Sequence, residues 1–167
     1  MPVSFMPTMM TPALTDLTAE FLKQKNIRLL MLDFDNTIVP YTTSVPTPQM
    51  ESWLREMAAS DVQLCVVSNS HKDRVKIFCH QYGIDCITHA NKPFSKGIHQ
   101  CLEKYGIPRE ACALVGDQIF TDTLGANCAG VRSVLVKAIH NHNIWLKLRH
   151  VAEMPFILIS GNRRIRK

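Results

Sequence analysis

The chain has 167 residues, of which 46% are hydrophobic and 20% charged, and its formal net charge at pH 7 is +5. This composition suits one globular domain over residues 1–167 and excludes a disordered chain, because enough apolar surface is present to offset the entropy cost of folding. The apolar runs are far shorter than the ~20 residues that span a bilayer, so we expect no membrane-spanning helix. Residues 1–12 carry no charge and lack the pattern of a secretory signal, so we expect a cytoplasmic protein.

In chain order, the hydrophobic patterns predict an alternation of helices and strands. The sequence predicts a helix over 11–25, a strand over 27–34, a helix over 49–59, a strand over 61–67, a helix over 72–82, a strand over 85–88, a helix over 95–105, a strand over 112–115, a helix over 119–129 and a strand over 131–136. Strands separated by single helices require crossover connections, which make neighbouring strands parallel. We therefore predict an α/β fold, a three-layer sandwich with a mostly parallel central sheet.

The excess positive charge is concentrated at the C-terminal end. Residues 1–136 hold 12 Lys and Arg against 13 Asp and Glu, whereas residues 137–167 hold seven basic residues against one Glu. Three interpretations stay open for this basic segment at about 140–167. It could attach to anionic lipid head groups, bind RNA phosphates, or be a solvated tail.

Polar side chains gather at the ends of the predicted strands, where open parallel sheets bind their ligands. In chain order they belong to Asp33, Asp35, Ser68, Asn69, Lys92, Asp117 and Asp122. The four carboxylates would repel one another by on the order of 4 kcal/mol for each pair at ~4 Å and an effective dielectric of about 20. We therefore expect a cation among them, and a hard divalent ion with oxygen ligands, first of all Mg²⁺, suits that environment.

The same strand ends carry the groups that phosphoryl transfer requires. Lys92 supplies a second cation, and Ser68 and Asn69 supply hydrogen bonds to phosphate oxygens. Catalysis of this reaction consists mainly of positioning and charge neutralisation. One carboxylate would attack phosphorus to form an aspartyl phosphate, and a second would protonate the leaving oxygen and then activate water.

Four short motifs occur in order, each at the end of a predicted strand: D-x-D-N-T from Asp33, S-N from Ser68, K-P from Lys92 and G-D-x-x-x-x-D from Gly116. Together they resemble the motifs of the haloacid dehalogenase (HAD) superfamily of phosphatases, over about residues 29–136. The segments 33–39 and 116–122 resemble most closely the YqeG-like subfamily, HAD class IIIA. The resemblance implies a HAD-like Rossmannoid fold and Mg²⁺-dependent hydrolysis of phosphomonoesters.

The resemblance also implies a role for each matching residue. Asp33 would be the nucleophile and a metal ligand, and Asp35 would be the general acid and base, with its backbone carbonyl on the metal. Asp117 would be a further metal ligand, and Asp122 would hold Lys92 or a metal-bound water.

Phosphate binding and the choice of substrate are implied less directly. Ser68 would bind the transferring phosphate together with its neighbour Asn69, and Lys92 would hold both the phosphate and the nucleophile. Superfamily members select substrates through a cap domain, but the intervals 37–68 and 69–92 each have room only for one helix and one strand. We therefore expect a capless, open site that accepts a large substrate.

Two functions from different classes remain in view. Some proteins similar to the YqeG-like group act as phosphatidylglycerophosphate phosphatases, and an open site beside a basic segment at an anionic membrane surface is consistent with that. The alternative is a non-catalytic HAD-like module that binds RNA, the ribosome or a protein through its basic tail. The costly cluster of carboxylates argues for the phosphatase and against nucleic acid as a partner.

Overall fold

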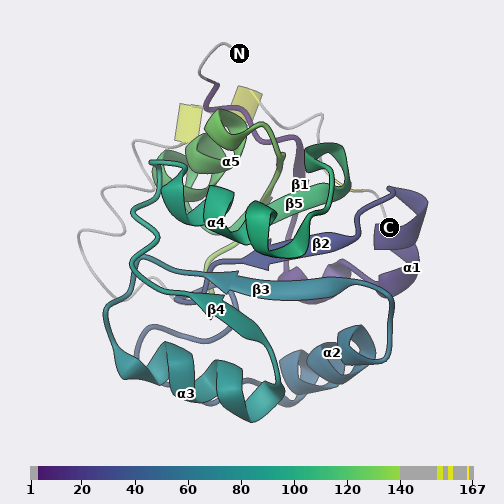
Figure 1. Ribbon diagram of the computed structural model, residues 1–167, viewed down its shortest axis with the longest axis vertical. Helices are drawn as coiled ribbons and strands as arrows, with labels where there is room; N and C mark the ends of the chain where they lie inside the picture. The colour runs from purple at the N-terminus through teal and green to yellow at the C-terminus, as the bar shows by residue number, and fades with distance from the viewer. Residues whose placement is uncertain (1–3, 140–153, 156–157, 160–164, 166–167) are drawn as a thin grey trace.

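The computed structural model describes residues 4–139, 154–155, 158–159 and 165. Its centre is a six-stranded sheet with the strand order β1-β6-β5-β2-β3-β4 (Figure 1). The strands are β1 (Met9–Thr11), β2 (Leu29–Leu32), β3 (Gln63–Val67), β4 (Asp85–Ile87), β5 (Cys112–Gly116) and β6 (Arg132–Val136). Every pair of neighbouring strands is parallel, which confirms the predicted sheet.

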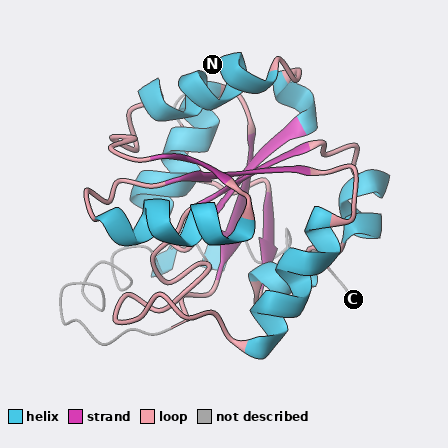
Figure 2. Ribbon diagram, turned by 60° about the horizontal axis from the view of Figure 1, so that its bottom comes forward, coloured by secondary structure: helices cyan, strands magenta, loops and turns pink. Residues whose placement is uncertain are grey.

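Helices cover both faces of the sheet, so the chain forms the three layers that the sequence predicts (Figure 2). One face carries α1 (Ala19–Gln24), α2 (Pro48–Ala58) and α3 (Asp73–Tyr82), and the other carries α4 (Lys96–Tyr105) and α5 (Leu124–Ala129). Three short helical turns, η1 (Leu14–Asp16), η2 (Arg109–Ala111) and the π-helical η3 (Ile119–Thr123), join these elements.

The central strand β2 is apolar throughout because both of its faces are covered. Leu30 and Leu32 contribute to the core beneath α2 and α3, whereas Leu29 and Met31 contribute to the core beneath α4 and α5. All four side chains are fully buried. This alternation explains why the segment reads as a continuous apolar run, as is typical of parallel strands covered on both faces.

The predicted helix over 11–25 is wrong. The chain instead forms the edge strand β1, the turn η1 and the short helix α1. The carboxylate of Asp16 accepts hydrogen bonds from Thr11 Oγ1 (2.9 Å) and from the backbone N–H of Ala13 (3.1 Å), which stabilises a turn in place of a helix. Helix α1 starts only after Thr18, whose hydroxyl accepts a hydrogen bond from the N–H of Phe21 (3.2 Å).

The intervals in which a cap domain could be inserted are short. The chain between β2 and β3 holds α2, and the chain between β3 and β4 holds α3. The basic segment at about 140–167 lies outside the described residues except at 154–155, 158–159 and 165, and its role stays a prediction, as does the single domain over 1–167. Across the part of the chain that the structure describes, no helix is long and apolar enough to cross a membrane.

Candidate active site

Three of the four predicted acidic residues meet at the carboxyl ends of β2 and β5. One carboxylate oxygen from each of Asp33, Asp117 and Asp122 lies within 4.8 Å of the others. Asp33 directly follows β2, and its backbone N–H donates to the carbonyl of Val115 (2.8 Å), which extends the β2–β5 pairing to this residue. The pairing of β2 with β5 therefore fixes the position of the Asp33 backbone at the carboxyl ends of these strands.

Lys92 reaches this cluster from the loop after β4. Its Nζ donates to Asp33 Oδ1 (2.7 Å) and to Asp122 Oδ1 (2.7 Å), and its side chain is 1% exposed. Burial alone would lower the pKa of Lys92, but the charges of Asp122 and Asp33 outweigh it and hold the pKa above its usual range. The ammonium group therefore stays charged and links the two carboxylates.

Asn69 fixes the backbone of Lys92. Its Nδ2 donates to the carbonyl of Lys92 (2.8 Å), and its Oδ1 accepts from the N–H of Lys92 (2.7 Å). The neighbouring Ser68 is 2% exposed, and its Oγ accepts from the N–H of Ser70 (3.0 Å). The S-N motif thus ties the loops after β3 and β4 together beside the carboxylates.

The glycine of the G-D-x-x-x-x-D motif makes room for Asp122. A Cβ atom added to Gly116 would lie 2.2 Å from the carboxyl carbon of Asp122, closer than any real contact. Asp122 is 2% exposed, and its Oδ2 accepts from the N–H of Gln118 (3.2 Å). Only glycine at position 116 leaves the buried carboxylate where Lys92 can reach it.

The loop after β2 turns back at Asn36, which carries a left-handed φ of 62°. Asparagine tolerates this conformation better than most residues do. Its N–H donates to the carbonyl of Val39 (2.7 Å), and its Oδ1 accepts from the N–H of Tyr41 (3.2 Å). The D-x-D-N-T motif therefore encodes a tight turn as well as two carboxylates.

The carboxylate of Asp35 stands apart from the other three and forms an ion pair with Arg74. Arg74 lies on α3 and also donates to the carbonyls of Tyr41 (2.9 Å) and Thr43 (3.2 Å), while its guanidinium lies 5.1 Å from the ring centre of Phe34. Burial raises the pKa of Asp35, although the charge of Arg74 opposes the rise. Sequence reasoning missed Arg74, because no local pattern marks it and its partner is 39 residues away.

The cluster of Asp33, Asp117 and Asp122 fits a divalent cation. Asp117 Oδ1 is buried, and it has no hydrogen-bond partner among the described residues. Burial, together with the charges of Asp122 and Asp33, raises the pKa of Asp117 to about 8. Burial also raises the pKa of Asp33 to about 7, with the charge of Lys92 acting against it. A hard cation would stabilise these carboxylates in their charged form.

These raised pKa values predict how the metal-free protein responds to pH. Asp33 and Asp117 titrate near 7 and 8 in the folded chain but near 3.8 when unfolded, so the folded state binds more protons between these limits. The free energy of unfolding should therefore fall as pH rises from about 4 to 8. Urea unfolding in EDTA at pH 5.5 and 8.5 measures this change, and added Mg²⁺ should restore stability at pH 8.5.

Two variants test the origin of that pH dependence. Asp117→Asn should flatten it and weaken the stabilisation by Mg²⁺. The control Asp85→Asn should leave it unchanged, because Lys104 and Tyr105 lower the pKa of Asp85 and its titration falls below this range. An Asp117→Asn profile equal to that of the unmodified protein would contradict the assignment.

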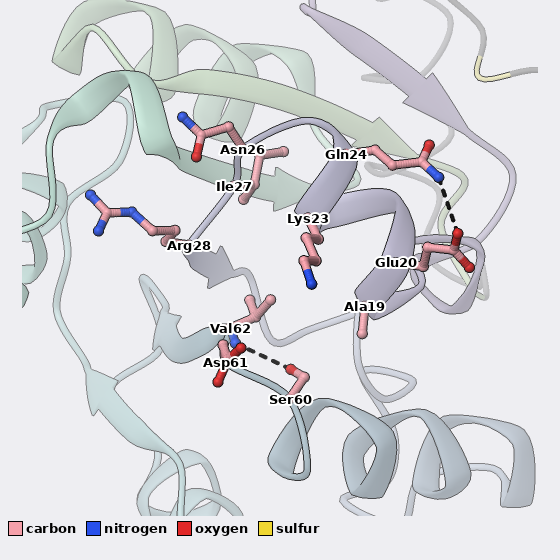
Figure 3. Close-up of a pocket in the computed structure, with 10 residues that line it drawn as sticks. All are labelled: Ala19, Glu20, Lys23, Gln24, Asn26, Ile27, Arg28, Ser60, Asp61 and Val62. Atoms are coloured by element: carbon pink, nitrogen blue, oxygen red, sulfur yellow. Dashed lines mark hydrogen bonds between the residues drawn. The ribbon is translucent and has the colours of Figure 1, made fainter.

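Figure 3 shows a pocket formed by residues other than those of the candidate site. It is lined by Ala19, Glu20, Lys23, Gln24, Asn26, Ile27, Arg28, Ser60, Asp61 and Val62. Residues 26–28 and 60–62 directly precede β2 and β3, so the pocket sits at the amino ends of these strands. Asp33 and Lys92 lie beyond the carboxyl ends, and the active site is therefore not assigned to this pocket.

Comparison with known proteins shows the family to which the chain belongs. Residues 1–139 match the family described as mitochondrial PGP phosphatase. The probable phosphatase YqeG of Bacillus subtilis (strain 168) is 33% identical over 132 residues, which cover 79% of this chain and 77% of that protein. The mitochondrial phosphatidylglycerophosphatase GEP4 of Saccharomyces cerevisiae is 29% identical over 147 residues, which cover 78% of this chain and 77% of that protein.

A solved structure shows the same fold. The cobalt-bound deoxy-D-mannose-octulosonate 8-phosphate phosphatase (YrbI) of Haemophilus influenzae superposes with a TM-score of 0.55 at 13% identity, covering 83% of this chain and 92% of that chain.

The parallel sheet and these relatives define a phosphatase with the HAD-like α/β fold, as the sequence motifs predict. The chain belongs to the mitochondrial PGP phosphatase family and is related to YqeG. It is an enzyme that hydrolyses phosphomonoesters, and its substrate is phosphorylated. Family membership favours this function over the non-catalytic binding module.

Proposed function

We propose that this phosphatase removes the terminal phosphate of phosphatidylglycerophosphate through an aspartyl phosphate formed on Asp33. The observation that carries the aspartyl-phosphate chemistry is the contact of the Lys92 ammonium with Asp33 and Asp122 at the carboxyl ends of the strands. The names of the family and of the yeast relative support a phospholipid as substrate. The short intervals after β2 and β3, which leave the site without a cap domain, suit a substrate that is part of a membrane.

Asp33 acts as the nucleophile in this proposal. Its carboxylate oxygen bonds to phosphorus as the ester bond breaks, and the alcohol leaves. Lys92 holds that carboxylate at 2.7 Å and adds positive charge beside the phosphate. The Ser68 hydroxyl and the second N–H of the Asn69 amide would donate hydrogen bonds to the phosphate oxygens, because the first N–H of that amide already bonds the backbone of Lys92 beside the nucleophile.

Asp33, Asp117 and Asp122 would hold the divalent cation, together with the backbone carbonyl of Asp35. Mg²⁺ is the ion we favour, because all of these ligands are oxygen atoms. When bound, it supplies positive charge that offsets the charges of the phosphate and the carboxylates. The buried Asp117 Oδ1, which lacks a hydrogen-bond partner among the described residues, supports this assignment.

Asp35 acts as the general acid and base. It donates a proton to the leaving oxygen and then takes one from the water that hydrolyses the aspartyl phosphate. Burial raises its pKa, which favours the protonated form that the first step needs. Arg74 is a positioning residue, because its guanidinium holds the Asp35 carboxylate and ties it to the loop at Tyr41 and Thr43.

Arg74→Gln should therefore lower kcat by about 10- to 100-fold, because the acid is no longer held in place. The loss should be larger for an alkyl phosphate than for p-nitrophenyl phosphate, whose leaving group needs little protonation. The control Arg55→Gln removes an exposed arginine paired with Glu51 and should change neither rate. An equal loss on both substrates would contradict a role through Asp35.

The substrate is tested by phosphate release from phosphatidylglycerophosphate in mixed micelles, compared with sugar phosphates, nucleotides and phosphopeptides. We expect the phospholipid to give the highest kcat/KM. Activity on soluble esters without activity on the phospholipid would contradict the proposed substrate. Attachment of the basic segment to a membrane and a cytoplasmic location both stay predictions, and the yeast relative is named as mitochondrial.

A further inference from the structure

Three large apolar side chains are exposed on the loops around the candidate active site. Tyr41 is 53% exposed, Val45 72% and Phe94 76%. Tyr41 and Val45 lie on the loop that follows Asp35, and Phe94 lies two residues after Lys92. Both loops start at the carboxyl ends of the parallel strands, because they follow β2 and β4.

The structure fixes the backbones that present these side chains. The guanidinium of Arg74 holds the carbonyls of Tyr41 and Thr43, and the N–H of Val45 donates to Thr43 Oγ1 (3.1 Å). On the other side, the Asn69 amide holds the backbone of Lys92, just before Phe94. The contacts that anchor these loops are therefore the same ones that build the site.

Exposed lysines also lie at the carboxyl ends of the strands. Lys72 follows β3, Lys96 begins α4 and Lys137 follows β6. The Lys72 Nζ lies 4.6 Å from the ring centre of Tyr41, so apolar and basic groups are in direct contact. We call Tyr41, Val45, Phe94, Lys72, Lys96 and Lys137 the docking rim.

Among the exposed side chains at the docking rim, the three lysines outnumber the acids. Asp73 is an exposed acid beside Lys72, whereas Asp33, Asp117 and Asp122 form the cluster around Lys92. The pocket at the amino ends of β2 and β3 instead mixes acidic and basic residues, as Figure 3 shows.

We propose that the docking rim binds the surface of a bilayer that contains anionic phospholipids. The proposal rests on the proposed phospholipid substrate. Tyr41, Val45 and Phe94 would enter the boundary between head groups and acyl chains, and the lysines would contact anionic head groups. Contact with the bilayer would also cover the open site and exclude bulk water from it.

Sedimentation of the 167-residue chain with sucrose-loaded vesicles tests this proposal. Vesicles of phosphatidylcholine with 30% phosphatidylglycerol should bind the protein, and vesicles of phosphatidylcholine alone should bind it much less. The double variant Val45→Ser/Phe94→Ser should bind about ten-fold or more weakly, because two apolar side chains no longer leave water. Ile77→Ser is the matched control, since Ile77 is 67% exposed on α3 and lies outside the docking rim.

The charge contribution is measured in the same assay. Lys96→Gln/Lys137→Gln should weaken binding by about five-fold for each lysine removed. The matched control Lys23→Gln/Lys25→Gln changes two exposed lysines near the amino end of β2, away from the docking rim. This control should bind like the unmodified protein. All variants should keep their turnover of p-nitrophenyl phosphate, which requires no membrane.

Two results would overturn the proposal. One is absence of binding to the anionic vesicles, and the other is unchanged binding by the Val45→Ser/Phe94→Ser variant. If deletion of residues 161–167 alone removed binding, the basic segment would be the attachment site in place of the docking rim. Failure of the proposed substrate would show separately, as absence of phosphate release from phosphatidylglycerophosphate in detergent micelles.

Discussion

Replacing Asp33 with Asn should lower phosphate release by about 10³-fold or more, because an amide cannot attack phosphorus. The change is nearly isosteric, and Lys92 keeps its contact with Asp122 at 2.7 Å, so the fold should be retained. Initial rates with p-nitrophenyl phosphate and with phosphatidylglycerophosphate measure the effect, and urea unfolding checks the fold.

The matched control for this prediction is Asp85→Asn, which changes an aspartate that pairs with Lys104 at an exposed position. This variant should retain the full rate. If Asp33→Asn kept more than about a tenth of the kcat, another group would have to be the nucleophile.

Replacing Lys92 with Met should both abolish activity and destabilise the protein. Met is close to Lys in length but carries no charge, so the buried carboxylates of Asp33 and Asp122 would lose their shared partner. Removing one member of a buried ion pair costs about 3–5 kcal/mol, and we expect a loss of that size in the free energy of unfolding at pH 7.5.

The destabilisation by Lys92→Met should shrink at pH 5, where protonation removes charge from the buried carboxylates. Lys104→Met serves as control, because its partner Asp85 is exposed and a surface ion pair contributes little. Unfolding of Lys92→Met at the same urea concentration as the unmodified protein, in metal-free buffer at pH 7.5, would contradict the buried ion network.

The sequence predicts the sheet and most of the site because both depend on local signals. A strand covered on both faces must be apolar along its length, and Leu29–Leu32 therefore stands out from its surroundings. Once such strands are located, their carboxyl ends are known, and Asp33 and Asp117 fall directly after two of them. Neighbouring parallel strands then bring these side chains together without further information.

The features that the sequence missed depend on contacts distant along the chain. Strand β1 has only three residues, and its pairing with β6 joins Met9 to Val134. Arg74 looks like an ordinary surface residue of an amphipathic helix until the fold brings it to Asp35. The space left by Gly116 for Asp122 likewise becomes visible only in three dimensions.

The most direct test of the account is a rapid-quench experiment with substrate carrying radioactive phosphate. Within the first turnover, we predict that label appears on the protein, is released by hydroxylamine as an acyl phosphate should be, and maps to the peptide containing Asp33. The Asp33→Asn variant should carry no label. Release of free phosphate in the first turnover, with no labelled protein at any time, would contradict the assignment of Asp33 as the nucleophile.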